Sequence, residues 1–128
     1  MIVAGVGCRR GVSAAAIEAA VSAALTRAGF AADALAMIAT AAAKEHEDGI
    51  KAAAVRLGVS FVLVPQNELE AAGPRTATRS ERVLRLTGVP SLAEAAALAA
   101  AGPAARLLGP RLVVGAVTCA LATTGATT

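Results

Sequence analysis

The chain has 128 residues, a formal net charge of +3 and an apolar fraction of 56%, and it contains neither Trp nor Tyr. This length suits one domain with a core of its own. Nucleic-acid binding is disfavoured because the 12 Lys and Arg residues are dispersed and only two Phe residues could stack on bases. A membrane span is also disfavoured, because the longest apolar candidate, residues 112–122, has about half of the roughly 20 residues required.

The cysteines and the single histidine do not form a pattern typical of a metal site or a disulfide framework. Cys8 and Cys119 lie near opposite ends of the chain, and His46 has no second imidazole with which to form a metal pair. We therefore predict reduced thiols, no metal and no cofactor. Arg9 and Arg10 follow the first apolar segment, whereas the charges of a secretion signal precede it, so we expect a cytoplasmic protein.

The first half of the chain alternates strand and helix patterns. Short apolar runs bounded by breakers predict strands over residues 2–6, 34–39 and 59–64. Apolar stripes at helical spacing predict helices over residues 13–28 and about 45–57, with residues 40–44 as a loop. Gly29 and Gly58 are placed to end these helices, and Ser13 is placed to cap the first. Glu47 and Asp48 fall in the first turn of the second helix, where its dipole favours acids.

The second half begins with a polar stretch, residues 66–79, whose Gly and Pro predict a variable loop or lid. A short helix is expected over residues 80–86. Ser91 and Glu94 form a capping-box pattern that opens a helix ending at about residue 101. Two strands follow, over residues 105–108 and 111–122, and the tail at residues 123–128 is expected to fray.

These elements predict an α/β fold, a three-layer α/β/α sandwich around a mixed, mostly parallel sheet of about five strands. We expect a mixed sheet because the few residues between the last two strands are too short for a parallel crossover. The elements predict a single domain over residues 1–122.

The loop after the first strand, residues 5–13, is the main candidate for a ligand site, because open α/β sheets bind ligands at the carboxyl ends of their strands. Gly7 and Gly11 would let the backbone approach a ligand closely, and Arg9 and Arg10 can bind carboxylates through two hydrogen bonds each. With the helix start that follows, this loop predicts an anion-binding corner. The alternative is a tight turn with two solvated arginines, since the pattern is neither a Walker loop nor a full dinucleotide fingerprint.

Other polar residues could join this edge of the sheet. Glu47 could orient Lys44 or act as a general base, and the alternative is an ordinary surface ion pair. His46, between them, is predicted to be a solvated loop residue, and the polar residues 66–68 are only weakly informative. Ser80 is most simply a helix N-cap, since a serine nucleophile would need a base and an orienting group.

Two segments carry a specific pattern: G-x-G-C-R-R-G-x-S at residues 5–13 and T-G-V-x-S-x-A-E-A-A-A-L at residues 87–98. Weaker matches are Lys44, Glu47 and Gly49, the pair Ser80 and Val83, and a V-T-x-A segment at residues 117–120. In this order and spacing, they resemble the CobE and CbiG C-terminal domain family of cobalamin biosynthesis proteins. The matches cover almost the whole chain, although residues 66–79 have no firm family pattern.

The resemblance implies a part in building the corrin ring of vitamin B12, with a precorrin or cobalt-precorrin as ligand. The short chain suits the free-standing type, which would bind this polycarboxylate as a carrier or accessory factor. The residues predicted to bind the ligand are Gly7, Cys8, Arg9, Arg10, Gly11, Ser13, Lys44, Glu47 and Ser80. Arg111 is a further cation that a polycarboxylate could use.

Other interpretations stay open. The fused proteins of the family open the ring-A lactone of a cobalt-precorrin, so this chain could be a precorrin lactone hydrolase with Lys44 and Glu47 as catalytic residues. The glycine turn alone would also suit a small phosphate- or nucleotide-binding module. Other enzymes of the corrin pathway are candidate partners, and an alanine- and valine-rich surface could support a homodimer. Nucleic acid and membrane partners are not expected.

Overall fold

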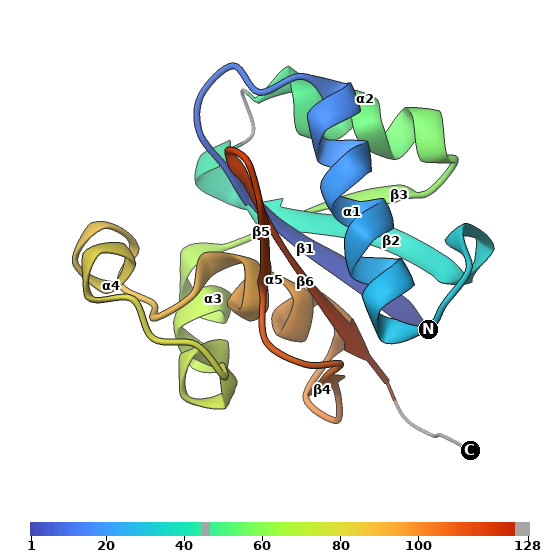
Figure 1. The fold of residues 1–128 in the computed structure, drawn as a ribbon. Helices are drawn as coiled ribbons and strands as arrows, with labels where there is room; N and C mark the ends of the chain where they lie inside the picture. The colour runs from blue at the N-terminus through green and yellow to red at the C-terminus, as the bar shows by residue number, and fades with distance from the viewer. Residues whose placement is uncertain (45–46, 125–128) are drawn as a thin grey trace.

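The computed structural model describes residues 1–44 and 47–124. Helices lie on both faces of one six-stranded sheet, so the predicted α/β class is confirmed (Figure 1). The strands are β1 (Ile2–Cys8), β2 (Leu35–Ala41), β3 (Ser60–Val64), β4 (Arg106–Leu107), β5 (Leu112–Val114) and β6 (Val117–Thr123). The helices are α1 (Ala14–Ala28), α2 (Asp48–Leu57), α3 (Gln66–Ala72), α4 (Glu81–Thr87) and α5 (Leu92–Ala101).

The sheet is mixed, with strand order β3-β2-β1-β6-β4 and with β5 also paired to β6. β1, β2 and β3 are parallel, whereas β6 runs antiparallel to β1, β4 and β5. The sheet thus has six strands where about five are predicted, and its parallel part is confined to β1, β2 and β3. The carboxyl ends of these three strands meet at one edge, which is the edge where a ligand is expected.

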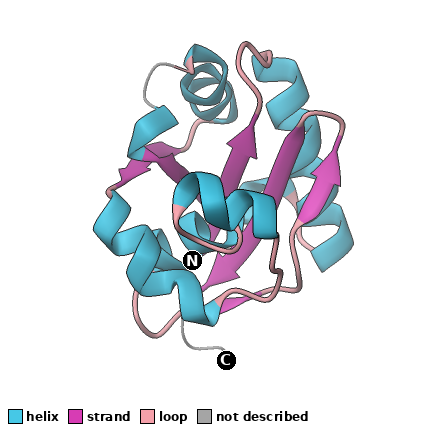
Figure 2. Cartoon of the chain, turned by 90° about the vertical axis from the view of Figure 1, so that its left-hand side faces the viewer, coloured by secondary structure: helices cyan, strands magenta, loops and turns pink. Residues whose placement is uncertain are grey.

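The first face of the sheet is covered by α1 and α2. Side chains of β1 alternate between the faces, as the two-residue period of a strand requires. Ile2, Ala4 and Val6 are buried on this face with Ile17 of α1 and Ile50 of α2. Figure 2 shows the strands with helices on either side of them.

The opposite face is covered by α5, with α3 packed beside it. Val3 of β1 is buried there with Leu69 of α3 and Leu98 of α5. A Cβ atom added to Gly5 would lie 1.9 Å from the carbonyl oxygen of Ala93, so glycine at this position allows α5 to lie directly on β1. The start of α5 is therefore held close to the carboxyl end of the central strand.

The predicted loop or lid at residues 66–79 is wrong in its first half. Residues 66–72 form α3, and a 3₁₀ turn follows over residues 73–75. Pro65 follows the last residue of β3, and its carbonyl oxygen accepts the N–H groups of Glu68 and Leu69 at 3.0 and 3.1 Å. The residue that ends the strand therefore also starts the helix. Burial of Leu69 and Ala72 against α5 stabilises this helix, a tertiary contact that local composition does not reveal.

The last predicted strand, residues 111–122, is instead a hairpin of β5 and β6. Gly115 sits in its turn with φ +59°, a conformation that favours glycine. β2 extends through Thr40 and Ala41, which are predicted as loop, and the described part of the second helix starts at Asp48 with Glu47 as its N-cap. Thr123, predicted to lie in the frayed tail, pairs with Ile2 in the sheet. Residues 45–46 and 125–128 lie outside the described part of the chain.

The predicted helix caps are confirmed. Ser13, Ser80 and Ser91 each accept a backbone N–H at the start of α1, α4 and α5, and Gly29 and Gly58 end α1 and α2 in left-handed conformations. In the part of the chain that is described, no single helix is both long enough and apolar enough to cross a membrane. Only α4 and α5 together reach that length and composition, and they are bent by 62°.

Candidate functional site

A cavity of about 380 Å³ opens at the carboxyl end of β1. Its lining comes from the end of β1, from α4, from the start of α5 and from the β5–β6 hairpin: Gly7, Cys8, Arg9, Lys44, Val83, Leu86, Thr87, Leu92, Ala93, Arg111, Val113, Gly115, Ala116 and Thr118. A smaller cavity of about 260 Å³ shares Lys44, Leu86, Thr87 and Leu92 with it and extends to Ala41, Ala43 and Gln66 at the ends of β2 and β3. We call the two cavities together the groove.

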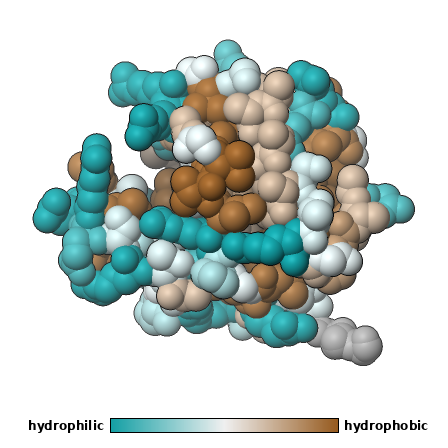
Figure 3. All heavy atoms as spheres, in the orientation of Figure 1, coloured by the Kyte–Doolittle hydropathy of each residue, from teal (hydrophilic) through white to brown (hydrophobic). Residues whose placement is uncertain are grey.

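The groove has apolar walls and a cationic lining. Leu86 of α4 is 73% exposed and Val113 of β5 is 58% exposed, and both line the larger cavity. Among the described residues, the charged side chains that line the groove are the three cations Arg9, Lys44 and Arg111. Figure 3 shows a hollow with hydrophobic atoms between the α4 side of the molecule and the main body. Such a lining suits a ligand with an apolar body and anionic substituents.

The first loop contributes only part of its predicted residues to the groove. Gly7, Cys8 and Arg9 line it. Arg10, Gly11 and Ser13 are exposed residues outside its lining, and the Ser13 hydroxyl caps α1 by accepting the Ala16 N–H at 3.2 Å. The structure thus separates the two neighbouring arginines that the sequence treats alike.

Lys44 and Glu47 both bind the backbone of the first loop. The Lys44 ammonium donates to the carbonyl oxygen of Cys8 at 2.9 Å, and a Glu47 carboxylate oxygen accepts the Gly11 N–H at 3.0 Å. Lys44 also lines the groove, whereas Glu47 lies outside the lining. The two side chains therefore hold the loop in place, and only Lys44 is placed to contact a ligand directly. The prediction for His46 falls outside the described residues.

Gly49 explains how the loop is kept against α2. A Cβ atom at this position would lie 2.1 Å from the carbonyl oxygen of Val12, so the loop packs on the backbone of the first helical turn. The glycine that is unfavourable inside a helix is thus required by a close backbone approach. Lys44, Glu47 and Gly49 thus each contact the first loop, and together they hold it in position.

Both cysteines are held as thiols. Burial raises the pKa of the Cys8 thiol, an effect that the charge of Lys44 opposes and the charge of Glu47 reinforces. Burial raises the pKa of Cys119 to about 12, with Arg27 opposing the shift. Because the thiolate is the nucleophilic form, neither cysteine is activated for covalent catalysis near neutral pH.

Ser80 acts on the groove through α4. Its hydroxyl accepts the Val83 N–H at 3.3 Å, and its own N–H donates to the Pro90 carbonyl at 3.0 Å. The second bond closes a narrow neck beneath residues 81–89, from which α4 projects (Figure 1). The N-cap interpretation of Ser80 is confirmed, and the residue itself lies outside the groove lining.

Glu94 behaves differently from the capping box that the sequence predicts. The Ser91 hydroxyl accepts the Glu94 N–H at 3.4 Å, as expected, but the Glu94 carboxylate turns away and is fully buried. It accepts four hydrogen bonds, from the N–H groups of Ala77, Thr78 and Arg111 and from the Thr78 hydroxyl. The reciprocal half of the capping box is therefore replaced by contacts to segments 16 and 17 residues away.

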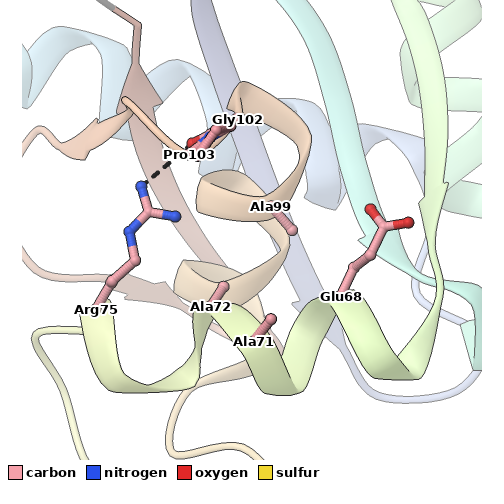
Figure 4. A pocket seen from close by; sticks show the side chains of 7 residues that line it. All are labelled: Glu68, Ala71, Ala72, Arg75, Ala99, Gly102 and Pro103. Carbon is pink, nitrogen blue, oxygen red and sulfur yellow. Dashed lines mark hydrogen bonds between the residues drawn. The ribbon is translucent and has the colours of Figure 1, made fainter.

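A further depression of about 360 Å³ lies between α3 and the end of α5 (Figure 4). Its floor is formed by Ala71, Ala72 and Ala99, and its one described cation, Arg75, donates to the carbonyl oxygens of Gly102 and Ala105 at 3.2 and 2.6 Å. Because this guanidinium already ties the 3₁₀ turn after α3 to the end of α5, the depression offers a ligand less than the groove does.

Sequence reasoning missed the apolar walls of the groove. Leu86 and Val113 occupy short elements that read as an ordinary helix and strand, and their exposure depends on where α4 and the hairpin project. Gly115 was the residue that could have revealed the β5–β6 hairpin, because a glycine inside an apolar run indicates a turn.

Comparison with known proteins adds a family and several relatives. The family model described as cobalamin synthesis G C-terminus matches residues 2–122. The chain is 37% identical, over 121 residues, to Protein CobE from a Sinorhizobium species, covering 94% of this chain and 79% of that protein.

Solved structures agree in fold. The crystal structure of CobE, a protein from the cobalamin biosynthetic pathway, matches with a TM-score of 0.89 and 35% identity over 95% of this chain and 89% of that chain. The cobalamin biosynthesis protein chiG from Agrobacterium tumefaciens matches with a TM-score of 0.80 and 48% identity, over 98% of this chain and all of that chain. A cobalamin biosynthesis protein G homologue from Sulfolobus solfataricus matches with a TM-score of 0.74 over 97% of this chain and 37% of that chain, and its 24% identity shows the fold alone.

Proposed function

The chain belongs to the cobalamin synthesis G C-terminal family and is a cobalamin biosynthesis protein, and from this premise we propose that it binds a precorrin intermediate in the groove as a carrier or accessory factor. Precorrins present carboxylate side chains around a large apolar ring. A site for such a ligand needs cations at its margin and an apolar surface at its centre.

The observation that supports this proposal is the combination of cations and apolar walls in one groove. Arg9, Lys44 and Arg111 come from three different segments, and the described lining places no acid among them. Leu86 and Val113 add exposed apolar surface on α4 and on the hairpin. Three dispersed cations can each meet a separate carboxylate of one ligand, which favours a polycarboxylate over a molecule with a single anionic group.

The direct test is a titration of the purified protein with a precorrin-stage intermediate, followed by absorbance and by mass spectrometry of the recovered ligand. Saturable binding with an unchanged ligand mass is the expected result for a carrier. A ligand that fails to bind would overturn the proposed function.

The same titration separates the hydrolase alternative. A lactone hydrolase would change the ligand mass, and Glu47→Gln would abolish the change while binding persists. Glu47 lies outside the groove lining, and its carboxylate accepts the Gly11 N–H. This contact favours a bracing role for Glu47. A phosphate- or nucleotide-binding module would instead be stabilised by nucleotides and indifferent to the tetrapyrrole.

A further inference from the structure

The buried carboxylate of Glu94 is held among residues that border the groove. Glu94 belongs to the first turn of α5, and its neighbours Leu92 and Ala93 line the larger cavity. One carboxylate oxygen accepts the N–H groups of Ala77 and Thr78, both at 2.8 Å. The other accepts the Thr78 hydroxyl at 2.7 Å and the Arg111 N–H at 2.8 Å. A carboxylate can accept about four hydrogen bonds, so its capacity is fully used.

The four donors belong to the two segments that lead into opposite walls of the groove. Ala77 and Thr78 immediately precede the neck of α4, and Arg111 immediately precedes β5. Each residue of α4 keeps part of its surface exposed, so packing alone holds this helix weakly. The α4 wall is therefore held in place largely by hydrogen bonds: the donors to Glu94, the Ser80–Pro90 bond, and the bond from the Gln66 side-chain amide to the Thr87 carbonyl oxygen at 2.6 Å. Among these, the Glu94 contacts are the ones that join α4 to the hairpin.

Burial of a carboxylate is costly unless it is fully hydrogen-bonded, and an apolar side chain could fill the same space. The arrangement at Glu94 does what an apolar side chain could not, because it links two chain segments at fixed distances. One of these segments carries a groove cation, Arg111, and the other leads into α4, which carries the apolar Leu86.

We propose that Glu94 is a positioning residue of the groove: its carboxylate sets the separation and orientation of the α4 wall and of Arg111, and ligand affinity depends on it. The affinity part of this proposal rests on the proposed function, whereas the positioning part concerns the protein without ligand. Both parts can be measured separately.

Glu94→Gln is the informative variant. A glutamine keeps one oxygen, which is best used on the two N–H groups of Ala77 and Thr78. Its NH₂ group then faces the Thr78 hydroxyl and the Arg111 N–H. The hydroxyl can rotate and accept a hydrogen bond from the NH₂ group, whereas the Arg111 N–H is itself a donor and loses its acceptor. The substitution should therefore release Arg111 while leaving the α4 tether largely intact. Thr78→Val is the complementary variant, because it removes only the hydroxyl contact on the α4 side.

The positioning part is tested by amide hydrogen exchange in the ligand-free protein. Glu94→Gln should raise the exchange rate of the Arg111 amide more than those of Ala77 and Thr78, and Thr78→Val should show the reverse order. Glu81→Gln is the matched control, since Glu81 is an exposed residue of α4 that pairs with Arg79 outside the groove. An Arg111 amide that exchanges equally in Glu94→Gln and the wild type overturns the proposal. Should Glu94→Gln fail to fold, the Thr78→Val comparison decides.

The affinity part is tested with the precorrin titration on folded variants. Glu94→Gln should weaken binding about tenfold, the effect of displacing one charged hydrogen-bonding partner of the ligand. In an Arg111→Ala background the same substitution should weaken binding much less, because the displaced side chain is already absent. Equal losses in both backgrounds, or no loss, would overturn the link to Arg111. A wild-type protein that binds no precorrin would instead overturn the proposed function, and the exchange experiment would still decide the positioning part.

Discussion

The two sides of the groove are built in different ways. On the sheet side, the first loop lies on the carboxyl end of β1 and is braced by Lys44, by Glu47 and by close packing on Gly49. On the other side, α4 projects on a closed neck and the hairpin approaches from the far end of the chain, with Glu94 as their common support. One side is held by several contacts along a packed edge, whereas on the other side one buried carboxylate joins the base of α4 to the base of the hairpin. Substitutions should therefore affect the two sides unequally.

The largest effect is expected at Glu94, measured against Glu47, the carboxylate on the other side of the groove. Glu94→Ala leaves four donor groups in partly buried positions without their acceptor and should lower the free energy of unfolding by about 3 kcal/mol or more. Glu47→Ala loses one hydrogen bond at a more exposed site and should cost about 1 kcal/mol or less. Urea denaturation of both variants measures the difference, and equal losses would contradict the proposed asymmetry between the two sides.

A smaller loss of stability is expected at Gly49. Glycine-to-alanine exchange inside a helix is normally stabilising, but here the new methyl group would meet the Val12 carbonyl oxygen at 2.1 Å. We expect Gly49→Ala to destabilise the protein by about 1–3 kcal/mol through this overlap. Gly7→Ala is the control, because a Cβ atom there meets no atom within 4 Å. A thermal-unfolding midpoint for Gly49→Ala at or above that of Gly7→Ala would refute the close approach.

Arg9 and Arg10 allow a comparison within the sheet side of the groove. Arg9 lines the groove and Arg10 does not, although both are exposed. Arg9→Ala should weaken precorrin binding about tenfold, the value of one charged hydrogen-bonding contact, whereas Arg10→Ala should change it little. Isothermal titration of both variants at one salt concentration gives the ratio. Equal losses would mean that the charge of the loop matters and the lining does not.

The smallest effect is expected at the apolar wall. Leu86 is 73% exposed in the structure, so Leu86→Ala should leave the unfolding free energy almost unchanged. If the ligand covers this side chain, binding should weaken by several-fold, in line with about 1 kcal/mol for lost apolar contact. Val55, which is also 73% exposed but lies on α2, provides the control through Val55→Ala. A ligand affinity that falls equally in both variants would argue against α4 as a ligand-contacting wall.

Local signals in the sequence were sufficient for most elements. Ser13, Ser80 and Ser91 start helices because a hydroxyl can satisfy a backbone N–H two or three residues ahead, and Gly29 and Gly58 end them because glycine adopts a left-handed conformation easily. The short link between the last two predicted strands was enough to predict a mixed sheet, because it is too short for a parallel crossover. Each of these rules acts within a few residues of the chain.

Contacts between distant segments account for what the sequence did not predict. α3 forms because Leu69 packs on α5, and the Glu94 carboxylate turns from its local partner to donors in two remote segments.

The candidate site divides in the same manner. The motif at residues 5–13 and the neighbouring Lys44 and Glu47 pointed to the edge of the sheet at which the groove opens, because the carboxyl ends of parallel strands must meet there. The way in which α4 and the hairpin project from the domain decided the rest. It decided which arginine lines the groove, and it made Leu86 and Val113 the apolar walls. The sequence pattern therefore determined the elements and the edge. The packing of segments far apart in the chain determined the shape and lining of the groove, because such packing energies have no local signature.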